Sequence, residues 1–177
     1  DIAIEYMEEM KDSPLADDDF RENYLYELGL MLTEYARTAG DAKLRDQLYP
    51  QARETLEIYG QGTAGPLGGA KALTELGNIL VERGRQLVQK ANLPTQKANK
   101  DSLTIEARKL YDEAQKMFEN VEEFYRSELK DSTRFPKSID PTKDKKLFDL
   151  RQEYRAQFGK TGLDVATVVY EKAQTYD

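Results

Sequence analysis

Two stretches of the sequence are near-copies of each other and decide the fold: "ELGLMLTEYAR" at residues 27–37 and "ELGNILVERGR" at residues 75–85. Both place a Leu-Gly pair at the same point and follow it with apolar and charged residues at helical spacing. The identical pairs are Glu27/Glu75, Leu28/Leu76, Gly29/Gly77, Leu32/Leu80, Glu34/Glu82 and Arg37/Arg85. Such self-similarity predicts an architecture made of repeated helical units.

A second pair of copies follows the first. The segment "LYPQARETLEIY" (residues 48–59) aligns with "LYDEAQKMFENV" (residues 110–121), so that Ala52 matches Ala114 and Leu56 matches Phe118. Glycine has no Cβ, so it allows the first helix of each pair to approach the second closely. The small Ala and the large Leu or Phe of the second helix then fill the groove between the two helices. The chain is therefore predicted to contain two copies of a helix pair, at about 18–60 and 67–130.

Helical spacing of apolar residues extends over most of the chain, and nothing predicts β-structure. We expect helices at about 2–11, 18–38, 41–59, 67–90, 102–130 and 141–176, with a kink or restart at Pro50 in the third. The fifth should begin at Asp101 or Ser102, and the sixth should be capped by Asp140. Gly159 and Gly162 could divide the sixth helix, but one helix is favoured. Its apolar stripe is predicted to contain Leu147, Leu150, Tyr154, Phe158, Gly162, Val165, Val169 and Ala173.

Composition excludes several classes of function. The chain has 26 basic and 33 acidic side chains, a net charge of −7, which argues against a broad nucleic-acid surface. It has no Cys, hence no disulfide or thiolate site, and no His, the commonest general base. No apolar run is long enough to span a membrane. Because the chain opens on Asp1 with neither Met nor signal peptide, we expect a piece of something larger, and nothing indicates its compartment.

The acidic residues are unevenly distributed. Residues 1–34 hold 11 acidic and two basic side chains, a balance of −9. Asp17, Asp18 and Asp19 lie in a row, but calcium loops alternate their ligands around a glycine that is missing here. The dipole at a helix N-terminus explains these carboxylates without a metal. We therefore predict no metal and no cofactor. The 11 tyrosines are expected to pack in the core with their hydroxyls at its rim.

The glycine-rich stretch "GQGTAGPLGGAK" (residues 60–71) contains the spacing G-x-G-x-x-G. A dinucleotide-binding loop needs a preceding strand, and an amphipathic helix precedes this one. A phosphate-binding loop of the Walker type needs Gly directly before Lys, whereas Ala70 intervenes. The stretch is therefore predicted to be a turn between repeats, with Gly60 as a left-handed helix cap and Pro66 at the start of the next helix.

The pattern of the two helix pairs resembles the tetratricopeptide repeat, in which Leu-Gly marks the first helix and Ala, followed by Leu or an aromatic residue, marks the second. The flanks are similar: Ala3, Met7, Met10 and Pro14 resemble the end of a preceding repeat (residues 1–14), and "TGLDV" (residues 161–165) resembles the first helix of a following one (residues 141–177). The resemblance implies an all-α superhelix of stacked antiparallel helix pairs with long C-terminal helices. It further implies one helical segment, residues 1–177, of a longer bacterial-type repeat protein.

The resemblance also implies a function. First helices of this family line a concave face that holds peptides, so the chain would be a protein-interaction or scaffold segment rather than an enzyme. Its partners would be a protein or peptide and neighbouring repeats of the same chain. Two alternatives stay open: a passive spacer, and a carboxylate-based enzyme or small-ligand domain. The residues implied on the peptide-binding face are Tyr26, Leu30, Thr33, Glu34, Lys71, Thr74, Asn78, Val81 and Glu82.

Overall fold

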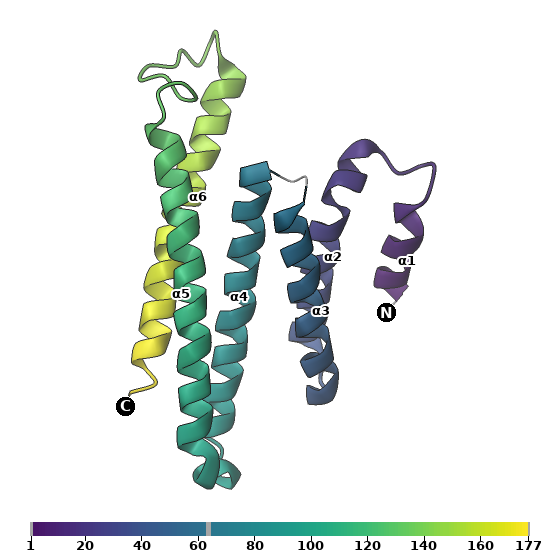
Figure 1. Cartoon of the computed structure of the whole chain (residues 1–177), viewed down its shortest axis with the longest axis vertical. Coiled ribbons are helices and arrows are strands. Elements are labelled where there is room, and N and C mark those ends of the chain that lie inside the picture. The colour runs from purple at the N-terminus through teal and green to yellow at the C-terminus, as the bar shows by residue number, and fades with distance from the viewer. Residues whose placement is uncertain (1, 63–64, 177) are drawn as a thin grey trace. The chain divides into compact units, whose positions relative to one another are not determined.

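The computed structural model describes residues 2–62 and 65–176, apart from the side chain of Ala3. Within these ranges it contains six α-helices, one 3-10 helix and no strand, which confirms the all-helical prediction (Figure 1). Residues 1–79 and 80–177 form two compact units, with α4 continuous across the division, and each unit is described by itself. The elements are α1 (Ile2–Lys11), α2 (Asp18–Thr38), α3 (Ala42–Gln61), α4 (Gly65–Ala91), η1 (Pro94–Asn99), α5 (Lys100–Lys130) and α6 (Lys145–Ala173).

In the first unit, α2 and α3 form an antiparallel pair joined by a short turn. Asp17 caps α2 by accepting a hydrogen bond from the Phe20 amide at 2.7 Å, which accounts for one of the three adjacent aspartates. A Cβ added to Gly29 would lie 2.6 Å from Leu56 Cγ, so the absence of a side chain lets the two helices meet there. This contact confirms the role predicted for the glycine of the first copy.

A restart of the helix at Pro50 and a left-handed cap at Gly60 were both predicted wrongly. Pro50 lies inside an unbroken α3, and Gly60 is helical rather than a left-handed cap, because α3 runs on to Gln61. A Cβ on Gly60 would lie 3.0 Å from Ala72 Cβ, so this glycine permits the close approach of α4. Among the described residues, only Gly65 has a positive φ, of 65°. Pro66 lies in the first turn of α4 as predicted, whereas positions 63–64 of the expected turn lie outside the described residues.

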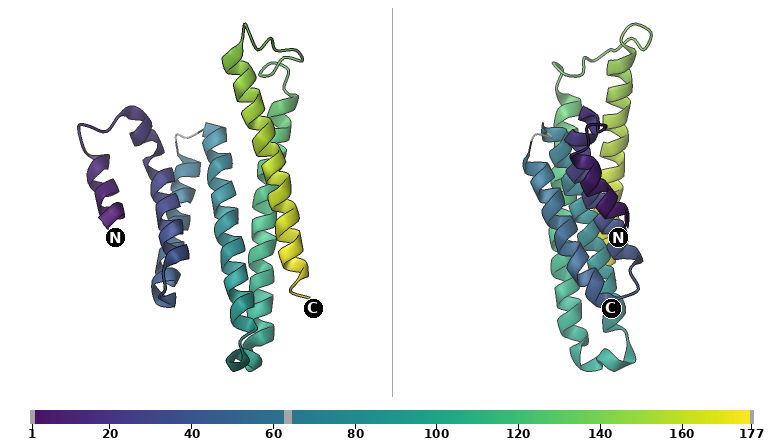
Figure 2. Two further views of the ribbon diagram at one scale, coloured as in Figure 1. Left: turned by 180° about the vertical axis from the view of Figure 1, so that it is seen from behind. Right: turned by 90° about the vertical axis from the view of Figure 1, so that its right-hand side faces the viewer.

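In the second unit, α5 and α6 run side by side along most of their length (Figures 1 and 2). Apolar residues recur along α5 at steps of three and four in the sequence, and those from Ala107 to Tyr125 are buried, as this helical spacing predicts. These residues share a core with Leu80, Val81 and Val168. A Cβ on Gly84 would lie 2.5 Å from the Tyr111 ring, so α4 uses a glycine that the repeat alignment did not single out.

The predicted stripe of α6 is only partly correct. Tyr154 is buried and Leu147, Leu150, Phe158 and Val165 are half-buried, but Val169 is 45 % exposed and Ala173 is also exposed. The buried seam instead continues through Thr161 and Val168. Its spacing is close to the ~3.5-residue repeat of helices that coil around each other. The prediction stepped by four residues too often and left the seam. The helix is nevertheless a single one, as predicted.

The boundaries of the long helices also differ from those predicted. The segment before α5 includes the 3-10 helix η1, and α5 begins at Lys100 with no side-chain cap. Asp140 does not cap α6, which starts five residues later at Lys145. Its carboxylate instead accepts hydrogen bonds from the Thr142 amide at 2.9 Å and the Thr142 hydroxyl at 2.7 Å. It therefore stabilises a local turn in the loop between α5 and α6.

Candidate functional site

The four predicted peptide-binding residues of α2 differ in accessibility. Tyr26 is half-buried, with its ring centroid 5.2 Å from that of Tyr59, and Leu30 is also half-buried. The Thr33 hydroxyl donates a hydrogen bond to a carbonyl of its own helix. Glu34 is exposed and pairs with Arg37 at 2.8 Å, and the hydrogen bond from Arg37 lowers the pKa of its carboxyl. Glu34 is therefore the member that this helix leaves most open to a ligand.

Three of the predicted residues lie on the part of α4 within the first unit. Lys71 is exposed and carries a mobile positive charge. Thr74 is only 9 % exposed, and its hydroxyl donates to the Ala70 carbonyl at 2.9 Å. The Asn78 side chain is half-buried, and its amide Nδ2 donates to Glu75 Oε2 at 3.2 Å. The amide has a second N–H, so a peptide backbone could accept from Asn78 without displacing Glu75.

The other two predicted residues of α4, Val81 and Glu82, belong to the second unit. Val81 is 7 % exposed and packs in the core with Ala107 and Phe118, so it is not on an open face. Glu82 is half-buried and lies 3.9 Å from Arg85. The resemblance to the tetratricopeptide repeat had placed Val81 and Thr74 on the ligand face. Burial removes both of them from any accessible site.

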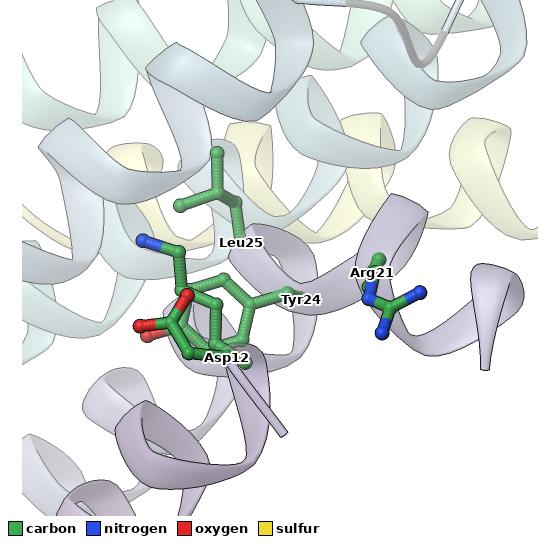
Figure 3. Close-up of a pocket in the computed structure, with 5 residues that line it drawn as sticks. Asp12, Arg21, Tyr24 and Leu25 are labelled. Carbon is green, nitrogen blue, oxygen red and sulfur yellow. The ribbon is translucent and has the colours of Figure 1, made fainter. Parts of the chain in front are cut away.

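A pocket of about 520 Å³ lies where the end of α1 meets the first turns of α2 (Figure 3). Figure 3 shows Asp12 beside Tyr24, and Arg21 turned away from them. The Arg21 guanidinium donates to the Ser13 carbonyl at 3.2 Å and pairs with Asp18 at 3.5 Å, so its charge is directed away from the tyrosine. The lining residues are Lys11, Asp12, Arg21, Tyr24 and Leu25.

Tyr24 is the buried polar residue of this pocket. It is 6 % exposed, and its ring is covered by Phe20 and by Lys11, whose Nζ lies 5.5 Å from the ring centroid. Among the described residues, no hydrogen bond reaches its hydroxyl. Burial raises the pKa of Tyr24, and the negative charges of Glu8 and Asp12 raise it further. The electrostatic environment of the hydroxyl is therefore dominated by carboxylates.

The face of α6 that points away from α5 carries a second apolar stripe. Leu163 is 66 % exposed and Tyr170 is 64 % exposed, with Val169 beside them. A Cβ added to Gly159 or Gly162 would meet nothing within 4 Å. The stripe has the spacing of a helix–helix seam but no helix packed on it in the described chain. Its exposed members are Ala156, Gly159, Leu163, Ala166, Val169, Tyr170 and Ala173.

The prediction that the tyrosines pack in the core is only partly correct: six of those described are buried, whereas Tyr6, Tyr170 and Tyr176 are more than 60 % exposed. The hydroxyl of Tyr111 is buried without a hydrogen-bond partner, rather than lying at the rim of the core. Burial, with the charge of Glu171 nearby, raises the pKa of Tyr111 to about 12. Arg85 and Glu171 form an ion pair of 2.8 Å close to this hydroxyl. The phenol therefore stays protonated at neutral pH.

Within residues 2–62 and 65–176, no group of three or more acidic, Cys or His side chains could hold a metal ion. Over the same residues, no helix has the length and apolarity needed to cross a membrane.

Sequence reasoning missed both the α1–α2 pocket and the outer stripe of α6. Arg21, Tyr24 and Leu25 are one helical turn apart and follow α1 after a short connection, so the pocket had a weak local signal. The outer stripe of α6 had a stronger sequence signal, because Gly159, Leu163 and Ala166 recur at steps of four and three. The signal was missed because α6 was assumed to have only one apolar stripe.

No protein-family model matches the chain, and no curated protein or solved structure matches it either.

Proposed function

We propose that the chain is a non-catalytic protein-interaction segment, related to tetratricopeptide repeats, that stacks against further helical units and presents a peptide-binding face. The observation that carries this proposal is the exposed outer stripe of α6, with Leu163 and Tyr170 at its centre. Exposed apolar stripes of this kind are typical of surfaces that another protein element covers. A helix that is apolar on two faces is suited to packing between two neighbours.

The occupant of the outer stripe is inferred from how the chain packs its other helices. Gly29 receives Leu56, and Gly84 receives Tyr111, so a glycine facing a large side chain occurs at a helix contact in each unit. Gly159 offers the same space on α6 without a neighbour in the described residues. The expected occupant is therefore an α-helix with large apolar side chains, as another helix pair of a repeat array would supply.

Light scattering and binding of a hydrophobic dye test this proposal. The parent protein should bind the dye and self-associate as concentration rises, whereas the double variant Leu163→Glu, Tyr170→Glu should do neither. The matched control is Asn120→Asp, Ser127→Glu, which adds the same two negative charges at exposed sites on α5. A parent that is strictly monomeric and does not bind the dye would contradict the proposed stacking surface.

The peptide-binding face requires a separate test. It is now reduced to the accessible predicted residues, chiefly Leu30, Glu34, Lys71 and Asn78. A peptide array probed with the parent and with a Lys71→Glu, Asn78→Ala variant of equal helicity should reveal peptides that only the parent binds. If no peptide distinguishes the two proteins, a passive spacer becomes the better interpretation.

A further inference from the structure

We propose that the α1–α2 pocket binds the side chain of a lysine or arginine from a partner protein. This site is distinct from both the α6 stripe and the face carrying Lys71. The inference does not depend on either of those surfaces, nor on the resemblance to a repeat family. It depends on the pocket beside Tyr24 and on the charges that surround it.

The first argument is the unused hydrogen-bonding capacity of Tyr24. Its side chain is 6 % exposed, yet no described residue hydrogen bonds to the hydroxyl, which lies at a pocket of about 520 Å³. Glu8 and Asp12 are close enough to act electrostatically on the same hydroxyl. Neither carboxylate forms an ion pair with a described residue. A lysine ammonium has three donors and no acceptor, which suits a pocket lined by the Tyr24 hydroxyl and the Asp12 carboxylate, with the charge of Glu8 acting from outside the lining.

The second argument concerns the cations already present. Arg21 is engaged by Asp18 and the Ser13 carbonyl, so its charge is partly neutralised. Lys11 has no such partner and lies over the face of the Tyr24 ring. Its position shows that this aromatic surface accommodates an ammonium group. An incoming cation would compete with Lys11, and the balance of −9 over residues 1–34 would attract it to this end of the chain.

Replacing Lys11 distinguishes a pocket that binds a cation from one that binds an anion. If the pocket holds a cation, Lys11→Met keeps the apolar stem, removes the competing charge and should tighten binding. If Lys11, Arg21 and the Tyr24 hydroxyl together hold an anion, the same substitution should weaken binding. Lys43→Met, at an exposed position of α3, makes the same charge change elsewhere in the first unit.

The experiment is a titration of the whole chain followed through its backbone amides by NMR. The probes are a blocked peptide Gly-Ser-Lys-Ser-Gly, its glutamate counterpart and inorganic phosphate. The lysine peptide should saturate shifts in residues 8–25, and Lys11→Met should lower its Kd by about fivefold, the effect of one charged contact. Tyr24→Phe should raise the Kd by about threefold, because a single neutral hydrogen bond is lost.

Two controls make the result decisive. Asp12→Asn should weaken binding clearly more than Glu22→Gln, which removes the same charge from an exposed position of α2 outside the pocket lining. Equal effects of these two substitutions, with shifts spread over all acidic surfaces, would mean non-specific attraction and would overturn the proposal. Saturation by phosphate or the glutamate peptide, weakened by Lys11→Met, would assign an anion site and would overturn it as well.

Discussion

The helix pairs α2/α3 and α5/α6 are both antiparallel, but different contacts hold them together. A short turn joins α2 to α3, and the pair closes on a direct contact between Gly29 and Leu56. A long loop, residues 131–144, joins α5 to α6. Because a longer loop places a weaker constraint on its ends, side-chain contacts at both ends of the pair have to set its alignment.

Those contacts are aromatic and polar rather than purely aliphatic. Near the loop, the Tyr154 ring packs edge-on against Tyr125 and Phe135, and its hydroxyl accepts a hydrogen bond from Arg134 at 2.7 Å. At the opposite end, Lys172 pairs with Asp112, and the Arg108 guanidinium bonds to Thr175 and stacks on Tyr176. The α2/α3 pair has contacts of the same kinds beside its glycine contact: the rings of Tyr26 and Tyr59 pack together, and the Tyr59 hydroxyl donates a hydrogen bond to Asn23 at 3.3 Å. The comparison therefore indicates that the pair with the longer connection adds further aromatic and polar contacts at both of its ends.

The largest expected effect comes from removing the aromatic contact between α5 and α6. Tyr154→Ala should lower the free energy of unfolding by about 3–5 kcal/mol, because a large ring that is 1 % exposed leaves a cavity. Tyr154→Phe, which loses only the bond from Arg134, should lower it by about 1–2 kcal/mol. Urea unfolding followed by circular dichroism measures both. If the two variants were equally stable, the ring cluster would not be what aligns this pair.

Alkaline pH should weaken α5/α6 through two buried tyrosines, each with a somewhat smaller effect than Tyr154→Ala. Burial raises the pKa of both Tyr111 and Tyr125 to about 12, against 10.0 for an unburied tyrosine. Below about pH 10 both tyrosines are protonated in the folded and the unfolded chain, so their contribution to stability is complete. Above it the unfolded chain ionises first, and stability falls until the folded tyrosines ionise near pH 12. Each should contribute a loss of about 2–3 kcal/mol over this interval.

Tyrosinate absorbance recorded together with circular dichroism checks this pH dependence. Ionisation of the buried tyrosines should coincide with loss of helix, and Tyr111→Phe should make the alkaline decline shallower. Ionisation near pH 10 with the helices intact would show that these hydroxyls are accessible in the folded chain.

The smallest of the three effects is expected at the α2/α3 contact. Gly29→Ala introduces a Cβ 2.6 Å from Leu56 Cγ and should cost about 1–3 kcal/mol of unfolding free energy. The matched control is Gly159→Ala, which meets nothing within 4 Å and should stabilise its helix by up to about 1 kcal/mol. Thermal and urea unfolding should therefore shift in opposite directions for the two variants. In the background of Leu56→Ala, Gly29→Ala should become almost neutral, since the clash is absent.

Local sequence signals predicted most of the helices. The spacing of α5 from Ala107 to Tyr125 was sufficient because one amphipathic stripe faces one core. Helix ends were less predictable: Asp140 carries a good capping side chain but uses it within a turn, while α6 begins at Lys145. Capping residues are equally suited to turns, so their presence alone does not locate a helix start.

The candidate sites were harder to predict than the helices. The face that the resemblance implied on α4 included Val81, which is buried. Residues that share one side of a helix can be read from the sequence, but not which side another helix covers. The α1–α2 pocket depends on how Lys11 and Asp12 meet Tyr24 across a connection, and no periodicity encodes that meeting.

The sequence alone specifies an all-helical chain, an internal repeat, the glycine that meets Leu56 and an acidic N-terminal region. These properties follow from composition and from side-chain spacing along a helix, which need no knowledge of neighbours. Tertiary structure decided that Gly60 is a contact rather than a cap, that Gly84 receives Tyr111, and which of the two apolar stripes of α6 is buried. The reason is physical: packing depends on which surfaces meet, and a one-dimensional pattern leaves that choice open.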